Sequence, residues 1–346
     1  MLYVTTRINQ DAFTAHRSLT ENRGPEGGLF LPMRMPDFSR EEIAALADKS
    51  FGQNVADIVN LLFNSKLDSW AVEFAIGRYP VRLVSLSSRI MVAESWHNPQ
   101  WKFDRLARNL AKTVLGTEEE LEITDWMLIA SRIAVLFGIF GELMHDGLAS
   151  VDAQLDIAVP CGDFSAPMAA WYARAWGLPI GTIVVCCNEN SAPWSLLHQG
   201  ELRTDAVAMH TALPACDHAV PADLERLVYA ALGAGEAKRF CDTCRKGGNY
   251  YLQEQQVGKL RQGMYVSVVS RQRIESMILS IYKNNGYISD PYAALAHGGM
   301  LDYRSRTGER RPALLLSEES PAFSLGMVSG CLGISQRELK ERINKG

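Results

Sequence analysis

Residues that could bind an anion follow a short apolar run near the middle of the chain. Leu155 to Pro160 has the length and composition of a buried strand, and Gly162 supplies the freedom for a sharp turn. Ser165 can cap the helix that follows, with Pro167 in its first turn. Free N–H groups and the positive end of the helix dipole coincide there. The turn is therefore a candidate anion site, although many such α/β turns bind nothing.

A single C-x-x-C, formed by Cys241 and Cys244, raises the possibility of metal or redox chemistry. A structural zinc site needs two more ligands with their own spacing, which neither Cys186–Cys187 nor His210 and His218 supply. A thioredoxin-like motif would open a helix after a strand, whereas here a Gly-Gly pair follows in a predicted loop. We expect two ordinary thiols and no metal.

The candidate anion turn belongs to a predicted βαβ unit, which requires a parallel sheet. Gly177 and Pro179 stop the helix, and the β-branched, apolar run Thr182 to Cys187 suits an interior strand. Further along, Asp125 to Met144 reads as a buried core helix, because Arg132 and Glu142 interrupt its apolar run. Near the start of the chain, a capping box at position 39 and short apolar strands indicate additional packed elements.

Composition limits the classes of protein. The 346 residues with 47% hydrophobic content can bury one large core or two modest ones. A net charge of -4 gives no basic excess for nucleic acid, and we expect no membrane span. We expect no signal peptide, because no cationic and apolar segment opens the sequence, and its seven irregularly spaced cysteines suit a reducing compartment. We expect a cytoplasmic α/β protein.

The gap-free stretch from Val159 to Gly200 resembles the threonine synthase family of fold type II pyridoxal-phosphate (PLP) enzymes. Their phosphate loop reads VP-[ST]-G-N-F-G-D and is followed by a helix, GLP, a strand and N-x-N; this chain has VPCGDFSA, GLP and NEN. GPEGGLFLP, the LERL helix start and GYISDPYAALA resemble three further family segments. The resemblance implies a mainly parallel, tryptophan-synthase-β-like sheet flanked by helices, PLP as cofactor and phosphohomoserine as substrate.

The family's Schiff-base lysine is the first point of departure. The family carries E-L-(F/W)-H-G-P-T-x-A-F-K-D, and this chain has ESWHNPQWKFD, which places Asp104 at the lysine position in a gap-free register. Lys102 lies two residues earlier. It could serve as the catalytic amine only if the loop after His97 is two residues shorter. Without a lysine amine at the correct position, no Schiff base with the cofactor can form.

The family's cofactor positions fall on Gly162, Asp163, Phe164, Ser165 and Glu318, and most are altered. Asp163 replaces a neutral asparagine. If its carboxylate lies ~5 Å from a cofactor phosphate, at an effective dielectric near 20, each unit of negative charge on the phosphate costs about 3 kcal/mol of repulsion. A helix dipole returns only about 0.3–2 kcal/mol, so a phosphate is disfavoured unless Asp163 turns away. An amine or a hydroxyl ligand suits this turn better. Glu318 stands where the family has the threonine that contacts the ring nitrogen, and a carboxylate there would change the ring's electronics.

The family's substrate loop, S-G-D-T-G, and most of its small lobe have no counterpart. We expect an N-terminal subdomain 1–85 and an α/β core domain 86–346. An acidic linker follows Gly116, so we place the deletion near 116–122, within the core domain. Met127 and Ile129 replace the family's Ser and Asn, whereas Arg132 matches its arginine. Because the departures fall on site positions and spare the scaffold, we expect a pseudoenzyme with no cofactor, and PLP if any. We expect it to assemble with a second copy of itself or with a protein partner through the surface left by the lobe. It could also bind a small molecule. The alternative is a residual PLP-dependent lyase using Lys102.

Overall fold

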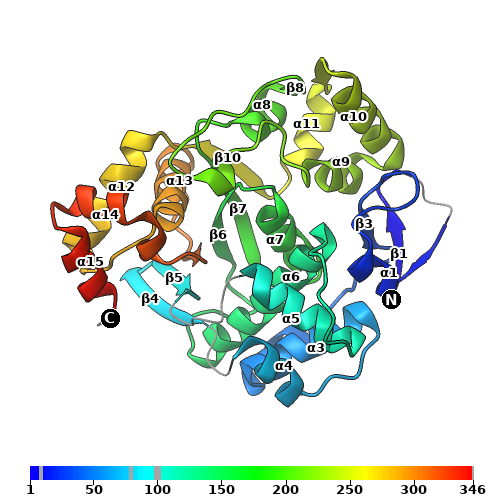
Figure 1. Ribbon diagram of the computed structural model, residues 1–346, viewed down its shortest axis with the longest axis horizontal. Coiled ribbons are helices and arrows are strands. Elements are labelled where there is room, and N and C mark those ends of the chain that lie inside the picture. Colours follow the sequence, from blue (N-terminus) through cyan, green and yellow to red (C-terminus); the bar gives the residue numbers. More distant parts are fainter. Residues whose placement is uncertain (8–10, 78–80, 97–102, 345–346) are drawn as a thin grey trace.

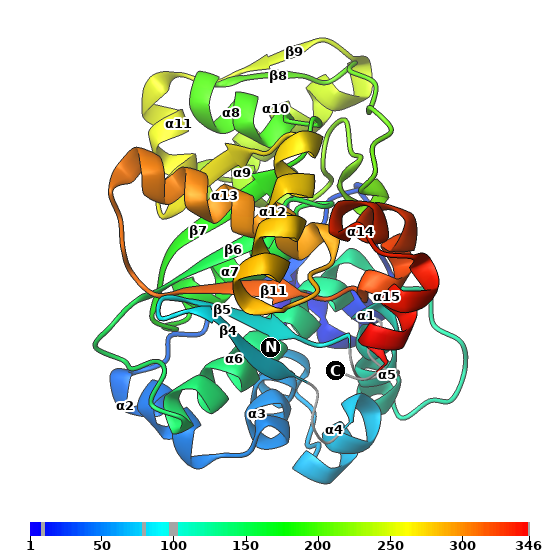
Figure 2. The ribbon, with the colours of Figure 1, turned by 90° about the vertical axis from the view of Figure 1, so that its left-hand side faces the viewer.

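The computed structural model describes residues 1–7, 11–77, 81–96 and 103–344. A six-stranded sheet forms its centre, and Figures 1 and 2 show helices on both sides of it. The strand order is β10 (Met264–Val268), β7 (Ile180–Cys187), β6 (Leu155–Pro160), β11 (Ala313–Ser317), β5 (Ile90–Glu94) and β4 (Arg82–Ser87). Neighbouring strands are parallel except β4 and β5. The mainly parallel α/β fold is therefore confirmed.

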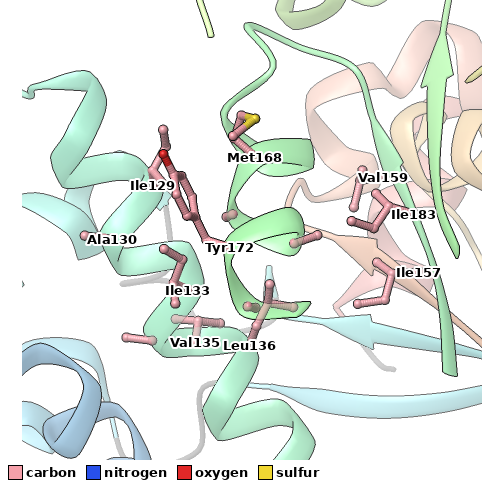
Figure 3. Close-up of a cluster of buried hydrophobic side chains, with 14 of the residues drawn as sticks. Ile129, Ala130, Ile133, Val135, Leu136, Ile157, Val159, Met168, Tyr172 and Ile183 are labelled. Carbon is pink, nitrogen blue, oxygen red and sulfur yellow. The ribbon is translucent and has the colours of Figure 1, made fainter. Parts of the chain in front are cut away.

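Alternate residues of the central strands face two separate cores, as the two-residue period of a strand requires. In β6, Ile157 and Val159 belong to one apolar cluster and Ala158 belongs to the other. The first cluster lies against α6 (Asp125–His145) and α7 (Ser165–Ala175). Figure 3 shows α7 between the sheet and α6. The second lies under α12 (Arg271–Asn285), α13 (Pro291–Thr307) and α14 (Leu325–Leu332). Burial on both faces explains why these strands read as continuous apolar runs.

Helix α6 is long and apolar enough to cross a membrane by composition alone, but 78% of its apolar window is buried inside the protein. It packs against α3 (Phe51–Phe63), α5 (Phe103–Leu115) and α7. Glycine permits the close approach to α3, because a Cβ at Gly141 would lie 2.2 Å from Asn54 Nδ2. The prediction of a buried core helix is confirmed.

The N-terminal segment forms a small antiparallel sheet of order β2-β1-β3, made of β1 (Leu2–Thr5), β2 (Phe13–Thr14) and β3 (Phe30–Pro32). The capping box of Ser39 and Glu42 is present at the start of α2 (Arg40–Ala44). The other elements of this half are α1 (Ala15–Thr20), η1 (Ala45–Asp48) and α4 (Ser69–Ile76).

The remaining elements follow β7 and β11 along the chain. Between β7 and β10 lie α8 (Ala192–Gln199), β8 (Glu201–Arg203), η2 (Pro214–Cys216), α9 (Leu224–Leu232), α10 (Ala234–Lys246), β9 (Asn249–Tyr251) and α11 (Glu254–Leu260). The chain closes with η3 (Pro321–Ser324), α14 and α15 (Gln336–Ile343). Asp290 caps α13 by accepting the N–H groups of Tyr292 and Ala293, and Pro291 takes the first helical position, where its missing N–H costs nothing.

Candidate functional site

The candidate site lies where two adjacent parallel strands end. Asp163 and Ser165 follow β6, and Glu318 follows β11 directly, so that both turns open at the same edge of the sheet. Helix α6 runs past this edge and contributes Arg132. Ligands of open α/β sheets bind at such an edge, outside the carboxyl ends of the strands.

Arg132 connects these segments. Its Nη2 donates to Glu318 Oε2 at 3.0 Å and its Nε donates to Glu318 Oε1 at 3.4 Å. Its Nη1 donates to Ser165 Oγ at 3.0 Å, and its guanidinium carbon lies 4.1 Å from the centroid of the Phe103 ring. The forked contact with a carboxylate and the cation–π contact together fix the guanidinium plane.

The start of α7 is capped by a carboxylate, which corrects the prediction that Ser165 is the cap. Ser165 is the first helical residue, and Asp163 Oδ1 accepts both its N–H, at 2.9 Å, and its hydroxyl. Phe164 stands at the cap position with a φ of 75°, and Gly162 has a φ of 51°. The Asp163 side chain therefore turns toward the helix end and takes up a donor that an exogenous anion would otherwise bind.

The charges around Arg132 are mostly negative. Burial alone would lower the pKa of the Arg132 guanidinium, but attraction from Glu318, Asp163 and Asp104 outweighs it and raises that pKa. One cation thus faces three carboxylates, of which Asp104 is exposed in the first turn of α5. A further anion at this point would be repelled, as expected from the sequence for Asp163 alone.

Little free space remains beside the pair. The cavity next to Arg132 and Glu318 has a volume of about 20 Å³, and its other walls are mostly apolar side chains, among them Val135, Leu136 and Leu316. Sites for cofactors and other small molecules commonly measure ~300–1,000 Å³. Among the described residues, the guanidinium, its carboxylate partner and these side chains leave far less space than such a site has. The arrangement does not fit PLP.

The predicted site residues are only partly brought together. Asp163, Ser165 and Glu318 meet through Arg132, whereas Phe164 is buried and Gly162 shapes the turn. Lys102 lies outside the described residues. The sequence comparison noted Arg132 but did not identify it as the centre of the network. A guanidinium inside an otherwise apolar helix was the available signal, because a buried charge requires a partner.

Among the substrate-side replacements, Met127 and Ile129 are buried in apolar clusters and have no polar group to offer. Cys241 and Cys244 lie in the last turns of α10. Burial raises the pKa of both thiols, to about 11 for Cys244, so both are protonated at neutral pH. Within the described ranges, no group of three or more His, Cys, Asp or Glu side chains could hold a metal ion.

The architecture and the position of this site define a fold type II PLP scaffold. Solved structures agree: PLP-bound threonine synthase from Brucella melitensis superposes with a TM-score of 0.84 at 18% identity, covering 97% of this chain and 92% of that one. Yeast threonine synthase gives 0.82 at 16% identity, covering 96% and 90%.

Sequence comparisons give the relationship more narrowly. A family model described as "Threonine synthase N terminus" matches residues 2–77. Human "Threonine synthase-like 1" is 24% identical over 188 residues, which cover 53% of this chain and 25% of that protein. Threonine synthase from Pseudomonas aeruginosa is 28% identical over 176 residues, covering 49% and 36%. The chain is thus similar to threonine synthases and threonine synthase-like proteins, and the matched region spans about a quarter to a third of these curated relatives.

Proposed function

We propose that this threonine synthase-like chain is a non-catalytic member of its fold group that binds or assembles and does not use PLP. The hydrogen-bonded pair of Arg132 and Glu318 carries this proposal, because it occupies the space at the strand ends with groups that are satisfied by each other. The chemistry that PLP supplies is electron withdrawal from a bound amine. That role requires room and a suitable ring partner, and this site offers neither.

Seating PLP would be costly in three ways. The two hydrogen bonds between Arg132 and Glu318 would have to break, at roughly 1.5–3 kcal/mol for a charged bond. The cofactor phosphate would meet Asp163, at about 3 kcal/mol for each like charge at ~5 Å. Finally, the N–H of Ser165 already donates to Asp163, so the helix N-terminus has one N–H fewer to donate to the cofactor phosphate. These costs exceed the about 0.3–2 kcal/mol that a helix dipole provides.

The assembly part of the proposal concerns the surface near α4 and α5. Helix α5 ends at Leu115 and α6 begins at Asp125, and we propose that most of the small lobe has been lost from this short connection. On α4, which packs against α5, Trp70 and Phe74 stack with ring centroids 5.8 Å apart and are 70% and 80% exposed. Adjacent exposed aromatic rings favour contact with another protein surface. We propose a second copy of this chain as the occupant, in a cytoplasmic homo-oligomer.

The first experiment separates this proposal from the alternative, a residual threonine synthase-type lyase acting on phosphohomoserine with Lys102 as the Schiff-base lysine. The purified protein is incubated with PLP, reduced with borohydride and examined by intact-mass and peptide mass spectrometry. We expect no adduct on Lys102 above the level of exposed surface lysines such as Lys340. A stoichiometric adduct that is lost in Lys102→Ala would establish the alternative.

The second experiment tests assembly. Multi-angle light scattering should report more than one copy per particle, and the double substitution Trp70→Ser with Phe74→Ser should shift the protein toward the monomer. Phe323→Ser is the matched control, because Phe323 is also an exposed aromatic residue, at 64%, on a different element. A monomeric wild-type chain, or equal effects of the two changes, would refute the proposed face.

A further inference from the structure

A larger cavity, of about 520 Å³, lies on another part of the molecule, where the N-terminal segment meets α9 and α10 (Figure 1). Arg7 and Arg23 line it from the N-terminal segment, Glu225 from α9, and Phe240 and Arg245 from α10. Its volume falls within the usual range for small-molecule sites. Among the described residues it shares no lining side chain with the cavity beside Arg132.

The positive charge in this cavity is only partly neutralised. Glu225, whose side chain is 6% exposed, pairs with Arg7, whose Nε and Nη2 each donate to one of its oxygens at 3.2 Å. Arg23 lies farther from the same carboxylate, with Nη1 3.9 Å from Oε2, and donates to the carbonyl of Gly27. One buried carboxylate therefore serves two guanidinium groups.

Arg245 adds a third guanidinium group and is 66% exposed. Its one acidic neighbour among the described residues' ion pairs is Asp242 of the same helix, at 3.5 Å. Asp242 lies nearer to Lys238, at 2.7 Å, so its charge is largely balanced already. The lining thus has three cations and one anion, an excess of about two positive charges.

The rest of the lining is suited to an apolar group. Val220, Pro221 and Ala222 precede α9 on one side, and Phe240 stands on α10 on the other. Guanidinium groups bind phosphate and carboxylate through paired, planar donors. We infer that this cavity binds a small organic dianion, with either one phosphate or two carboxylates as its charged part and an apolar body against the Phe240 side. This inference does not depend on whether PLP binds elsewhere.

Four probes test the inference by isothermal titration calorimetry at pH 8. Phenyl phosphate and phthalate are dianions with an apolar ring, benzoate has the ring and a single charge, and sulfate has two charges and no ring. We expect at least one of the first two to bind tighter than benzoate and tighter than sulfate. Which of the two binds better distinguishes a phosphate from a dicarboxylate ligand.

Variants locate the binding. Arg23→Gln and Arg245→Gln each remove one charge-assisted contact and should weaken the better dianion roughly 10- to 100-fold. Lys246→Gln is the control, because it removes a cation from the same helix, in the wall of a neighbouring cavity. Both arginines are substantially exposed, so the variants should keep the fold, which circular dichroism and the thermal midpoint without probe would check.

The possible results divide clearly. Weakening in both arginine variants, with none in Lys246→Gln, supports the site. Benzoate binding as tightly as the dianions would refute the charge argument, and sulfate binding as tightly would refute the apolar wall. No binding of either dianion at millimolar concentration, or equal binding by all variants, would overturn the inference.

Discussion

Replacing both members of the Arg132–Glu318 pair with methionine is expected to cost less stability than replacing Arg132 alone. The pair is largely sheltered, with side chains 15% and 29% exposed. Arg132→Met removes three hydrogen bonds and leaves Glu318 and Asp163 without the cation that attracts both. Breaking a fully buried pair costs about 3–5 kcal/mol, and the residual exposure of Glu318 reduces our expectation to about 2–3 kcal/mol.

The double replacement should behave differently because the cavity wall is already apolar. Two methionine side chains can fill that space, and Asp163, which loses the guanidinium in both variants, keeps its hydrogen bonds from Ser165, so the double variant should lose only about 1 kcal/mol. Glu318→Met alone should cost about 1–2 kcal/mol, since Asp163 and Ser165 remain near the guanidinium. The single changes then sum to about 3–5 kcal/mol, which implies a coupling of about 2 kcal/mol or more.

Urea unfolding of the four proteins, followed by tryptophan fluorescence and extrapolated to water, gives these free energies. The exposed i,i+4 pair Arg337 and Glu341, with side chains 90% and 55% exposed, is the control and should show a coupling of about 0.5 kcal/mol or less. If the Arg132 and Glu318 costs add to within ~0.5 kcal/mol, the two residues do not form the interacting unit on which the proposed function rests.

Two further predictions concern the scaffold. Burial raises the pKa of Asp290 to about 6, so the folded state binds the proton more tightly than the unfolded state, and this carboxyl's contribution to stability falls as the pH rises from about 4 to 6. Asp290→Asn cannot titrate, so the free energy of unfolding of this variant, measured by urea titration and compared with that of the wild type, should rise by about 1 kcal/mol between pH 5 and 7.5. If the difference between the two proteins does not change with pH, the raised pKa of Asp290 is wrong. Gly141→Ala places a methyl 2.2 Å from Asn54 Nδ2 and should lower the unfolding free energy by about 2 kcal/mol or more. Gly235→Ala, a helical position with open space around it, should be neutral or stabilising by up to about 1 kcal/mol, and equal losses in the two glycine variants would refute the close packing of α3 on α6.

Local sequence patterns predicted much of the scaffold correctly. The strand Leu155–Pro160 and the capping box at Ser39 follow from composition and capping chemistry within a few residues of chain. The βαβ unit followed from the same kind of pattern, because a strand, a helix and a second apolar strand require a parallel crossover. The acidic residue in the turn after β6 also predicts that an anion is disfavoured there, and this stays a prediction.

The cap of α7 shows where local reasoning failed. Ser165 is a good N-cap residue by type, yet the turn at Phe164 places it one position inside the helix and brings Asp163 onto its N–H. Backbone conformation at two residues, Gly162 and Phe164, decides which side chain caps. Residue type alone does not encode that choice, because several short polar side chains compete for the same donors.

By itself, the sequence determined the fold class and the similarity to threonine synthases, and it predicted that the cofactor-facing groups are replaced, since each of these depends on neighbouring residues or on motif spacing. The tertiary structure decided what the replacements do together. Arg132, Ser165 and Glu318 lie far apart along the chain, and only the parallel sheet, by ending β6 and β11 at one edge near α6, brings them within hydrogen-bonding distance. The same long-range packing places the three arginines around the second cavity, because Arg7 and Arg245 meet only when the N-terminal segment packs against α10.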